Sequence, residues 1–292
     1  MTIPVKKYDV KKGLEKYMPS LLRLIGNQNI SWTSINSGLL NHLQKVRSEL
    51  KESGESEIIK ETTFYSFLVG NTQGKKETAP MFDFFETIFS ELNERLSDKE
   101  LVHLHKMVKF VLSNFDYRYL NFIGELATLN AYKSTGKYSL LNIEEKIYSK
   151  KGVRADLFMR RVSDKREFLV EIVNIHLENR NLNDSSKIKH HIESKLKLKI
   201  DKTFFESPKR EIYIQPVVWI ESLEQIQIIS ELYRKKKIAM DNVYVPMCYM
   251  TYQLSNGDYE HRFEYVTTIL EEEQKKGNWI SRMLHGISIK KR

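Results

Sequence analysis

The chain of 292 residues contains a single cysteine, Cys248. One cysteine cannot form a disulfide within the chain, and this fits an intracellular protein. The N-terminus lacks the charged region, apolar stretch and small-residue cleavage site of a signal peptide. No apolar run approaches the ~20 residues that a membrane helix requires. We therefore expect a cytoplasmic protein without membrane association.

The motifs of several large functional classes are also lacking. The sequence has no GxxxxGK[ST] phosphate loop, no GxGxxG after a strand, no GxSxG elbow and no cysteine set for structural zinc. These absences remove the usual sequence support for NTPases, dehydrogenases, GxSxG hydrolases and zinc fingers.

The composition is that of a globular protein with an uneven charge. Hydrophobic residues make up 41% of the chain, and the length suits one large domain or two ordinary ones. Residues 1–120 hold 17 Lys and Arg against 15 Asp and Glu, a net charge of +2, whereas residues 121–292 hold 30 against 23, a net charge of +7. A basic half of this kind can neutralise the phosphates of a nucleic acid, although a plain solvated surface would have the same charge.

Residues 1–116 are predicted to form a helical N-terminal domain. Apolar residues recur at helical spacing in residues 36–53, 81–96 and 99–115. Ser97 or Asp98 can cap the last of these helices. Residues 26–32 and 70–80 are expected to be loops.

Residues 117–292 are predicted to form an α/β domain with a C-terminal β-hairpin extension. Helix-like stretches cover residues 117–132, 185–202 and 223–237, and strand-like stretches cover residues 138–148 and 211–220. Residues 242–254 and 259–270 flank Asn256 and Gly257, a strong hairpin signal. Pro246 argues against a central place for this hairpin in the sheet, because proline cannot donate to the ladder.

Residues 154–177 are predicted to form another hairpin, with two carboxylates on one face. If residues 163–166 make the turn, Phe158 faces Glu171 and Asp156 faces Val173. Asp156 and Glu171 are then diagonal neighbours, with Cα atoms roughly 7–8 Å apart. One hydrated divalent cation can bridge such a pair. Buried carboxylates are costly unless they are paired or bound to metal. The alternative is a wet sheet edge, or neutralisation by Arg154, Arg160 and Arg161.

The order of these elements (α, β, β, β, α, β) over residues 117–237 resembles the PD-(D/E)XK nuclease superfamily. The resemblance implies a restriction-endonuclease-like fold, that is, a mixed central sheet with flanking helices, here preceded by the helical N-terminal domain. It implies that Asp156 and Glu171 hold Mg²⁺ or Mn²⁺ and that Glu125, on the helix, joins the catalytic residues. Val173 occupies the position of the motif lysine, which in the family helps to activate the attacking water.

Two explanations of Val173 remain open. Lys187 or Lys189, on the following helix, could supply the missing cation, and Lys189 is our candidate catalytic lysine. Alternatively, the site is degenerate.

The helix at residues 185–202 also carries the candidate nucleic-acid contacts. Its isoleucines and leucine at positions 188, 192, 196 and 200 line one side, so most of its lysines project elsewhere. The candidate contacts are Lys187, Lys189, His190 and Lys195. The alternative is an ordinary solvated face.

We therefore predict a metal-dependent nuclease that acts on nucleic acid, with DNA favoured over RNA. The helical N-terminal domain is a candidate surface for a protein partner or a homodimer. The alternatives are an inactive nuclease-like protein that binds nucleic acid or supports an assembly, and a helical interaction scaffold with no nucleic-acid role.

Overall fold

The computed structural model describes residues 9–26, 30–53, 63–116, 118–146, 154–177, 184–204, 211–220, 223–238, 240–253 and 257–269. The chain divides into two compact units, residues 1–126 and 127–292. The division lies within helix α7 (Tyr119–Ser134), whereas the sequence analysis places a boundary after residue 116.

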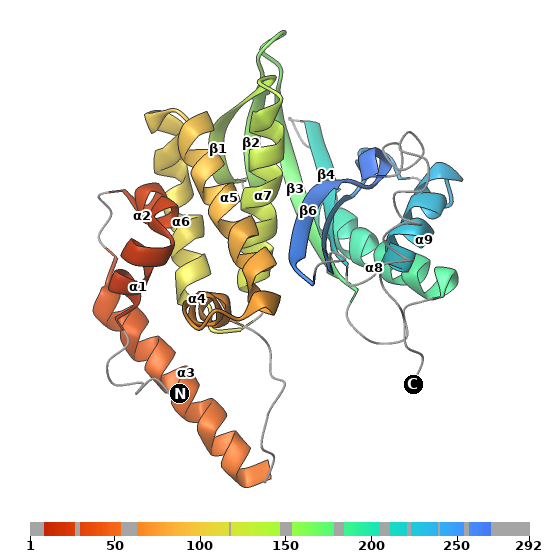
Figure 1. Ribbon diagram of the computed structural model, residues 1–292. Coiled ribbons are helices and arrows are strands. Elements are labelled where there is room, and N and C mark those ends of the chain that lie inside the picture. Colours follow the sequence, from red (N-terminus) through yellow and green to blue (C-terminus); the bar gives the residue numbers. More distant parts are fainter. Residues whose placement is uncertain are drawn as a thin grey trace. The chain divides into compact units, whose positions relative to one another are not determined.

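The first unit is helical, as predicted. Its elements are α1 (Val10–Tyr17), α2 (Pro19–Ile25), α3 (Trp32–Ser53), α4 (Phe64–Thr72), the short 3-10 helix η2 (Lys76–Thr78), α5 (Ala79–Arg95), α6 (Asp98–Ser113) and the start of α7. Figure 1 shows these helices in red to yellow. Phe64, Phe85 and Tyr119 pack ring against ring in the core of this unit, with centroids 5.6–6.2 Å apart.

Local signals explain two boundaries in this unit. Ser97 caps α6 in a capping box with Glu100, since the Ser97 backbone N–H donates to the Glu100 carboxylate at 2.9 Å. The loop predicted at residues 70–80 is much shorter, because α4 continues to Thr72 and α5 begins at Ala79. Pro80 lies in the first turn of α5, where its missing N–H costs nothing.

The second unit is built on a six-stranded mixed sheet in the order β1-β2-β3-β4-β5-β6. The strands are β1 (Tyr138–Lys146), β2 (Arg154–Arg161), β3 (Glu167–His176), β4 (Glu211–Trp219), β5 (Met247–Gln253) and β6 (Tyr259–Tyr265). β3, β4 and β5 are parallel to one another, and the remaining pairs are antiparallel. The prediction of a mixed sheet with flanking helices is confirmed.

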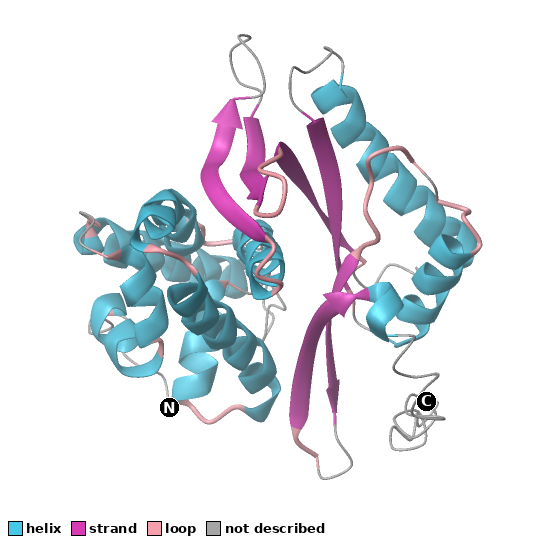
Figure 2. Cartoon of the chain, turned by 90° about the horizontal axis from the view of Figure 1, so that it is seen from above, coloured by secondary structure: helices cyan, strands magenta, loops and turns pink. Residues whose placement is uncertain are grey.

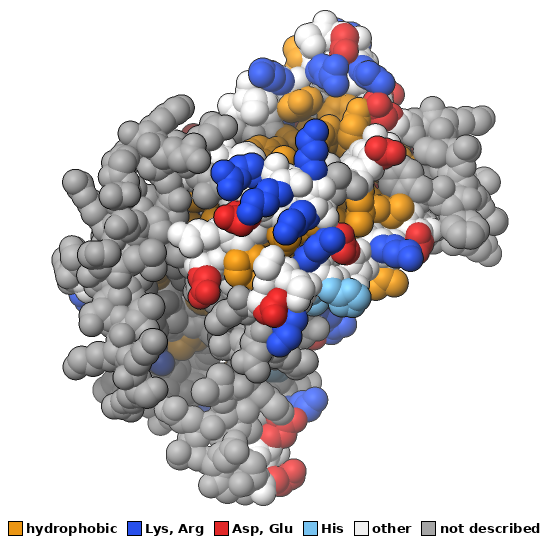
Figure 3. Space-filling view, turned by 90° about the vertical axis from the view of Figure 1, so that its right-hand side faces the viewer, with side chains coloured by type: hydrophobic (Ala, Val, Ile, Leu, Met, Phe, Trp, Pro, Cys, Tyr) orange, Lys and Arg blue, Asp and Glu red, His pale blue; other side chains and the backbone are white. Residues whose placement is uncertain are grey.

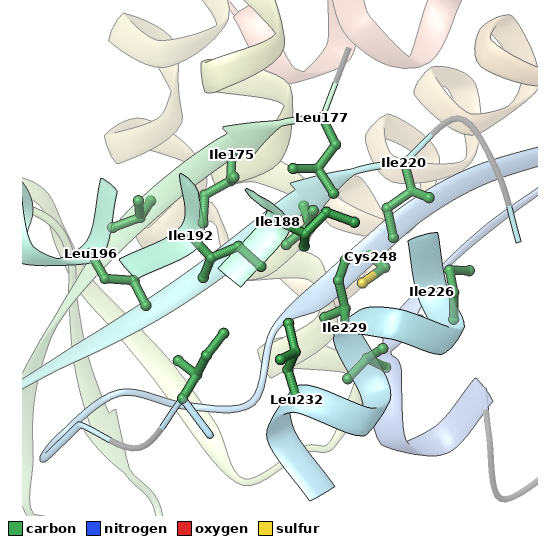
Figure 4. Close-up of a cluster of buried hydrophobic side chains, with 14 of the residues drawn as sticks. Ile175, Leu177, Ile188, Ile192, Leu196, Ile220, Ile226, Ile229, Leu232 and Cys248 are labelled. Atoms are coloured by element: carbon green, nitrogen blue, oxygen red, sulfur yellow. The ribbon is translucent and has the colours of Figure 1, made fainter. Parts of the chain in front are cut away.

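Two helices cover one face of this sheet. α8 (Ser185–Phe204) connects the parallel strands β3 and β4, and α9 (Leu223–Arg234) follows β4. Figure 2 shows both helices on the same side of the strands. Ile188, Ile192 and Leu196 of α8 are fully buried against this face, together with Ile175 and Cys248 of the sheet (Figure 4).

The predicted C-terminal hairpin forms β5 and β6 at one end of the sheet, and its expected place away from the centre is confirmed. The strands β5 and β6 do pair antiparallel, although Asn256 of the turn lies outside the described residues. Pro246 itself precedes β5, which begins at Met247. A proline instead lies within the central strand β4, at Pro216. The Gln215 side chain bridges this part of the sheet by donating to the Val245 carbonyl at 2.9 Å and the Pro216 carbonyl at 3.0 Å.

The register of the β2–β3 hairpin differs from the prediction by two residues. The Arg161 N–H donates to the Arg166 carbonyl at 2.8 Å, so the turn closes one residue earlier than expected on each strand. Phe158 therefore lies opposite Leu169 and not opposite Glu171. A shift of two residues preserves the face of every side chain. Asp156 and Glu171 consequently still share a face.

We predict that the face packed against α8 dominates the stability of the second unit. Ile192→Ala should lower the free energy of unfolding by about 2–5 kcal/mol, because it leaves a cavity at a fully buried position. Leu198→Ala, on the same helix but 69% exposed, should change it by no more than ~0.5 kcal/mol. Urea unfolding would measure both values, and equal effects would contradict this assignment of the core.

Candidate functional site

Asp156 and Glu171 lie next to each other on the second unit. The β2–β3 ladder runs as far as the pair Leu157 and Val170, and Asp156 and Glu171 are the next residue on each strand. Asp156 takes the place of a ladder partner, because its Oδ2 accepts a hydrogen bond from the Ile172 backbone N–H at 2.6 Å. This bond fixes the Asp156 carboxylate beside Glu171.

The cation that joins these carboxylates is Lys199 of α8. Its Nζ lies 2.7 Å from Glu171 Oε2 and 3.7 Å from Asp156 Oδ2. The exposed fractions of the side chains are 3% for Glu171, 19% for Asp156 and 25% for Lys199. The three groups form a compact, largely buried cluster, which we call the acid–lysine site.

The helical spacing of α8 explains how Lys199 reaches this position. Ile188, Ile192 and Leu196 recur every four residues and pack on the sheet. Lys199 follows Leu196 by three residues, so it continues the same stripe one turn further along the helix. The sequence analysis assigned the end of the stripe to Ile200 and did not select Lys199. The i+3 spacing from Leu196 does not identify it by itself, because Lys195 has the same spacing from Ile192.

Lys189, which the sequence analysis selected as the catalytic lysine, does not make this contact. Lys189 pairs with Glu193 of its own helix at 3.6 Å, and Lys187 is exposed near the start of α8. The three arginines considered as neutralising groups bind elsewhere: Arg160 pairs with Glu167, Arg161 pairs with Asp164, and Arg154 donates to the Glu144 carbonyl. Lys199 neutralises the carboxylates instead.

Val173 belongs to the apolar core. It is 6% exposed and lies in the same buried cluster as Ile192 and Leu196. A lysine at position 173 would have to bury its charge among these side chains, which is costly without a partner. The packing of α8 on the sheet thus accounts for the apolar residue at this position.

The remaining predicted residues lie away from these contacts or on another unit. Glu125 is half-buried on α7 within the first unit, so its role beside the two carboxylates stays a prediction. His190 and Lys195 are exposed on α8. Their role in nucleic-acid binding stays a prediction too.

The electrostatics of the site centre on Glu171. Burial, and next the negative charge of Asp156, raise the pKa of Glu171 from its ordinary value of 4.5 to about 8, although Lys199 acts in the opposite direction. A carboxyl group with a pKa near neutrality can exchange a proton at physiological pH. It can also bind a metal once it is deprotonated.

The donor set suits a hard cation in part. Mg²⁺ is commonly held by one or two carboxylates, with water or phosphate oxygens completing its shell, and Asp156 and Glu171 supply two carboxylates. Within the described ranges, no group of three or more His, Cys, Asp and Glu side chains converges on one point. The residues therefore fit a two-carboxylate site and not a site enclosed by protein ligands.

Comparisons with known proteins identify no family. A scan against protein-family models, a search of curated proteins and a search of solved structures each find no match for this chain. Across the part of the chain that is described, no helix combines the length and the apolar character needed to cross a bilayer.

We predict that Glu171 makes stability depend on pH. Because folding raises the pKa of Glu171, the native state binds more protons than the unfolded state between pH 4.5 and about 8. Burial lowers the pKa of His176 to about 4, and this opposes the effect of Glu171 below pH 6.5. The free energy of unfolding should therefore fall as the pH rises from 6.5 to about 8, with a slope of up to about 1.4 kcal/mol per pH unit. Glu171→Gln should remove this slope in urea titrations with a chelator present.

The matched control is Glu224→Gln, which changes an exposed carboxyl of α9. This variant should keep the slope of the wild-type protein. A Glu171→Gln protein that retained the full slope would show that another group binds the proton.

Proposed function

We propose that this chain is a metal-dependent nuclease that hydrolyses phosphodiester bonds of DNA through the acid–lysine site. The observation that carries the proposal is the convergence of Asp156, Glu171 and Lys199, with the ammonium 2.7 and 3.7 Å from the two carboxylates. Two acids and one lysine are the groups of a PD-(D/E)XK site, with the lysine supplied by α8 in place of position 173.

The order of elements around the site supports the same proposal. α7, β1, β2, β3, α8 and β4 follow one another in the predicted order, with β3 and β4 parallel. We propose on this basis that the second unit has a restriction-endonuclease-like fold. β5 and β6 extend that core by two further strands.

Each group of the site has a proposed role. Asp156 and Glu171 would hold Mg²⁺ or Mn²⁺, which supplies Lewis-acid chemistry by lowering the pKa of bound water and stabilising charge on the phosphate. Lys199 would stabilise negative charge on the phosphate during attack. Glu125 is proposed as an additional acidic group.

The charge of the molecule supports a polyanionic substrate. The basic residues outnumber the acidic ones by nine in the whole chain, and most of this excess lies after residue 120. Figure 3 shows Lys and Arg side chains gathered on the side that faces the viewer, with acidic side chains among them. We propose that Lys187, Lys189, His190 and Lys195 contact phosphates, and that the helical first unit recognises the target, a protein partner or a second copy.

We predict that metal-dependent cleavage requires all three groups of the site. Asp156→Asn, Glu171→Gln and Lys199→Met should each lower cleavage of single- or double-stranded DNA by at least about a hundredfold, because each removes a metal ligand or a charge-stabilising group. Gel assays with Mn²⁺ or Mg²⁺ would measure the rates, with RNA run in parallel.

The control for the lysine is Lys197→Met, which changes an exposed lysine on the same helix. It should cleave at the wild-type rate. Cleavage that persisted in Asp156→Asn and Glu171→Gln would place the active site elsewhere.

The second candidate function is an inactive nuclease-like protein that binds nucleic acid. The contact between Lys199 and Glu171 favours it, because the ammonium group already lies 2.7 Å from the carboxyl oxygen that a metal would need. Salt-sensitive DNA binding without cleavage in either metal would select this alternative.

We predict that metal affinity depends on pH through Glu171. Below a pKa of about 8 most of the Glu171 carboxyl is protonated, and a metal must displace that proton. Mn²⁺ affinity should therefore rise by up to about tenfold between pH 6.5 and 7.5, a tenfold change per pH unit being the limit for one displaced proton. Titration calorimetry would measure this dependence, which Glu171→Gln should abolish. An affinity that did not change with pH in the wild-type protein would exclude Glu171 as a ligand.

A further inference from the structure

The face of the sheet opposite the acid–lysine site contains an aromatic pocket. A cavity of about 170 Å³ is lined by the rings of Tyr132, Tyr138, Phe168, Tyr244 and Tyr265, with Lys137 and Thr135 beside them. Phe168 and Glu171 are three residues apart on β3, so their side chains point to opposite faces. The aromatic pocket is therefore separate from the carboxylates.

Contacts between rings hold the walls of the aromatic pocket in place. Tyr138 lies 5.5 Å from Tyr132 and 5.7 Å from Phe168 between ring centroids. Tyr244 stacks on Tyr213 at 4.9 Å, with an angle of 18° between the rings. Walls that are already ordered lose little conformational entropy when a ligand binds.

A hydrogen bond fixes the ring of Tyr132. Tyr132 is 7% exposed, and its hydroxyl donates to Gln215 Oε1 at 3.2 Å. The Gln215 amide nitrogen donates in turn to the Val245 and Pro216 carbonyls, so the orientation of the amide is set. Tyr132 is thus tied to the sheet and forms a fixed part of the pocket wall.

The size and composition of the pocket limit its ligand. Pockets for drug-sized molecules span about 300–1,000 Å³, so 170 Å³ suits a single ring system and not a whole cofactor. Aromatic walls favour a planar group that stacks. Burial raises the pKa of Tyr265 to about 12 and raises that of Tyr244 as well, so both hydroxyls stay neutral and can donate or accept hydrogen bonds.

The positive charge of Lys137 favours an anionic ligand. It is exposed, and it lies in the turn between α7 and β1, where its carbonyl accepts from the Val162 N–H at 2.9 Å. An aromatic pocket alone could hold a cation, but an ammonium group at its edge disfavours one and attracts an anion. A planar polar ring attached to an anionic group satisfies both features.

We propose that the aromatic pocket binds a nucleobase whose phosphate lies against Lys137, carried either by a mononucleotide or by single-stranded nucleic acid. Stacking on aromatic side chains is how proteins hold unpaired bases, and a neighbouring basic side chain neutralises the backbone. The proposal does not depend on the nuclease activity, because the pocket shares no residue with the acid–lysine site.

The test uses the full chain carrying Asp156→Asn, in a chelator, so that cleavage cannot affect binding. The probes are AMP, dTMP, oligo(dA), oligo(dT) and ribose 5-phosphate, which lacks a base, and titration calorimetry measures their affinities. Tyr244→Leu should weaken base-containing probes by about 5- to 150-fold, the range reported for loss of one stacking ring. Ribose 5-phosphate should not bind measurably.

Lys137→Gln provides a second variant that leaves the aromatic walls intact. It should weaken AMP and dTMP several-fold, whereas Lys146→Gln, an exposed lysine near the other end of β1, should not. Binding of the mononucleotides would support a free nucleotide as ligand, and binding of the oligonucleotides alone would support a single strand. The proposal is overturned if no base-containing probe binds, or if Tyr244→Leu and Lys137→Gln both bind as tightly as the parent.

Discussion

A carboxylate buried in the middle of the sheet imposes the central constraint on the second unit. Glu171 is 2% exposed in β3, a strand that pairs with neighbours on both sides. A charge at this depth is costly unless a partner compensates it, and the backbone of the sheet offers none. Lys199 supplies the partner, and through it the end of α8 is bound to β3 and to Asp156 of β2.

The same constraint explains the arrangement of residues along β3. Val173, Ile175 and Leu177 follow Glu171 on the α8 face and are buried in one apolar cluster. The side of α8 that packs on the sheet is therefore apolar from Ile188 to Leu196 and presents a lysine, Lys199, where the sheet presents acids. A lysine at position 173 would interrupt that cluster, whereas Lys199 approaches from beyond its end. α8 therefore covers the apolar core with one part of its length and contributes Lys199 to the acid–lysine site with another.

The two faces of the sheet are suited to different chemistry. On one face, the carboxylates of Asp156 and Glu171 lie beside the ammonium group of Lys199. On the other face, tyrosine and phenylalanine rings line the aromatic pocket, with Lys137 beside them. The residue before Pro216 in the central strand β4, Gln215, links the sheet to the aromatic pocket. Gln215 contributes hydrogen bonds there and also fixes the hydroxyl of Tyr132. A side chain needed for the integrity of the sheet thus also shapes the aromatic pocket.

The sequence by itself determined the helical first unit, the order of elements from α7 to α9 and the shared face of Asp156 and Glu171. These features depend on local periodicity and capping, which adjacent residues encode. Only the tertiary structure decided the register of the β2–β3 hairpin and the identity of the lysine, because a turn that closes one residue earlier shifts every cross-strand pair by two. Six lysines of residues 185–202 are equivalent as a local pattern. Lys199 differs from the others because the packing of α8 brings it to the buried carboxylates, and that contact joins residues distant in sequence.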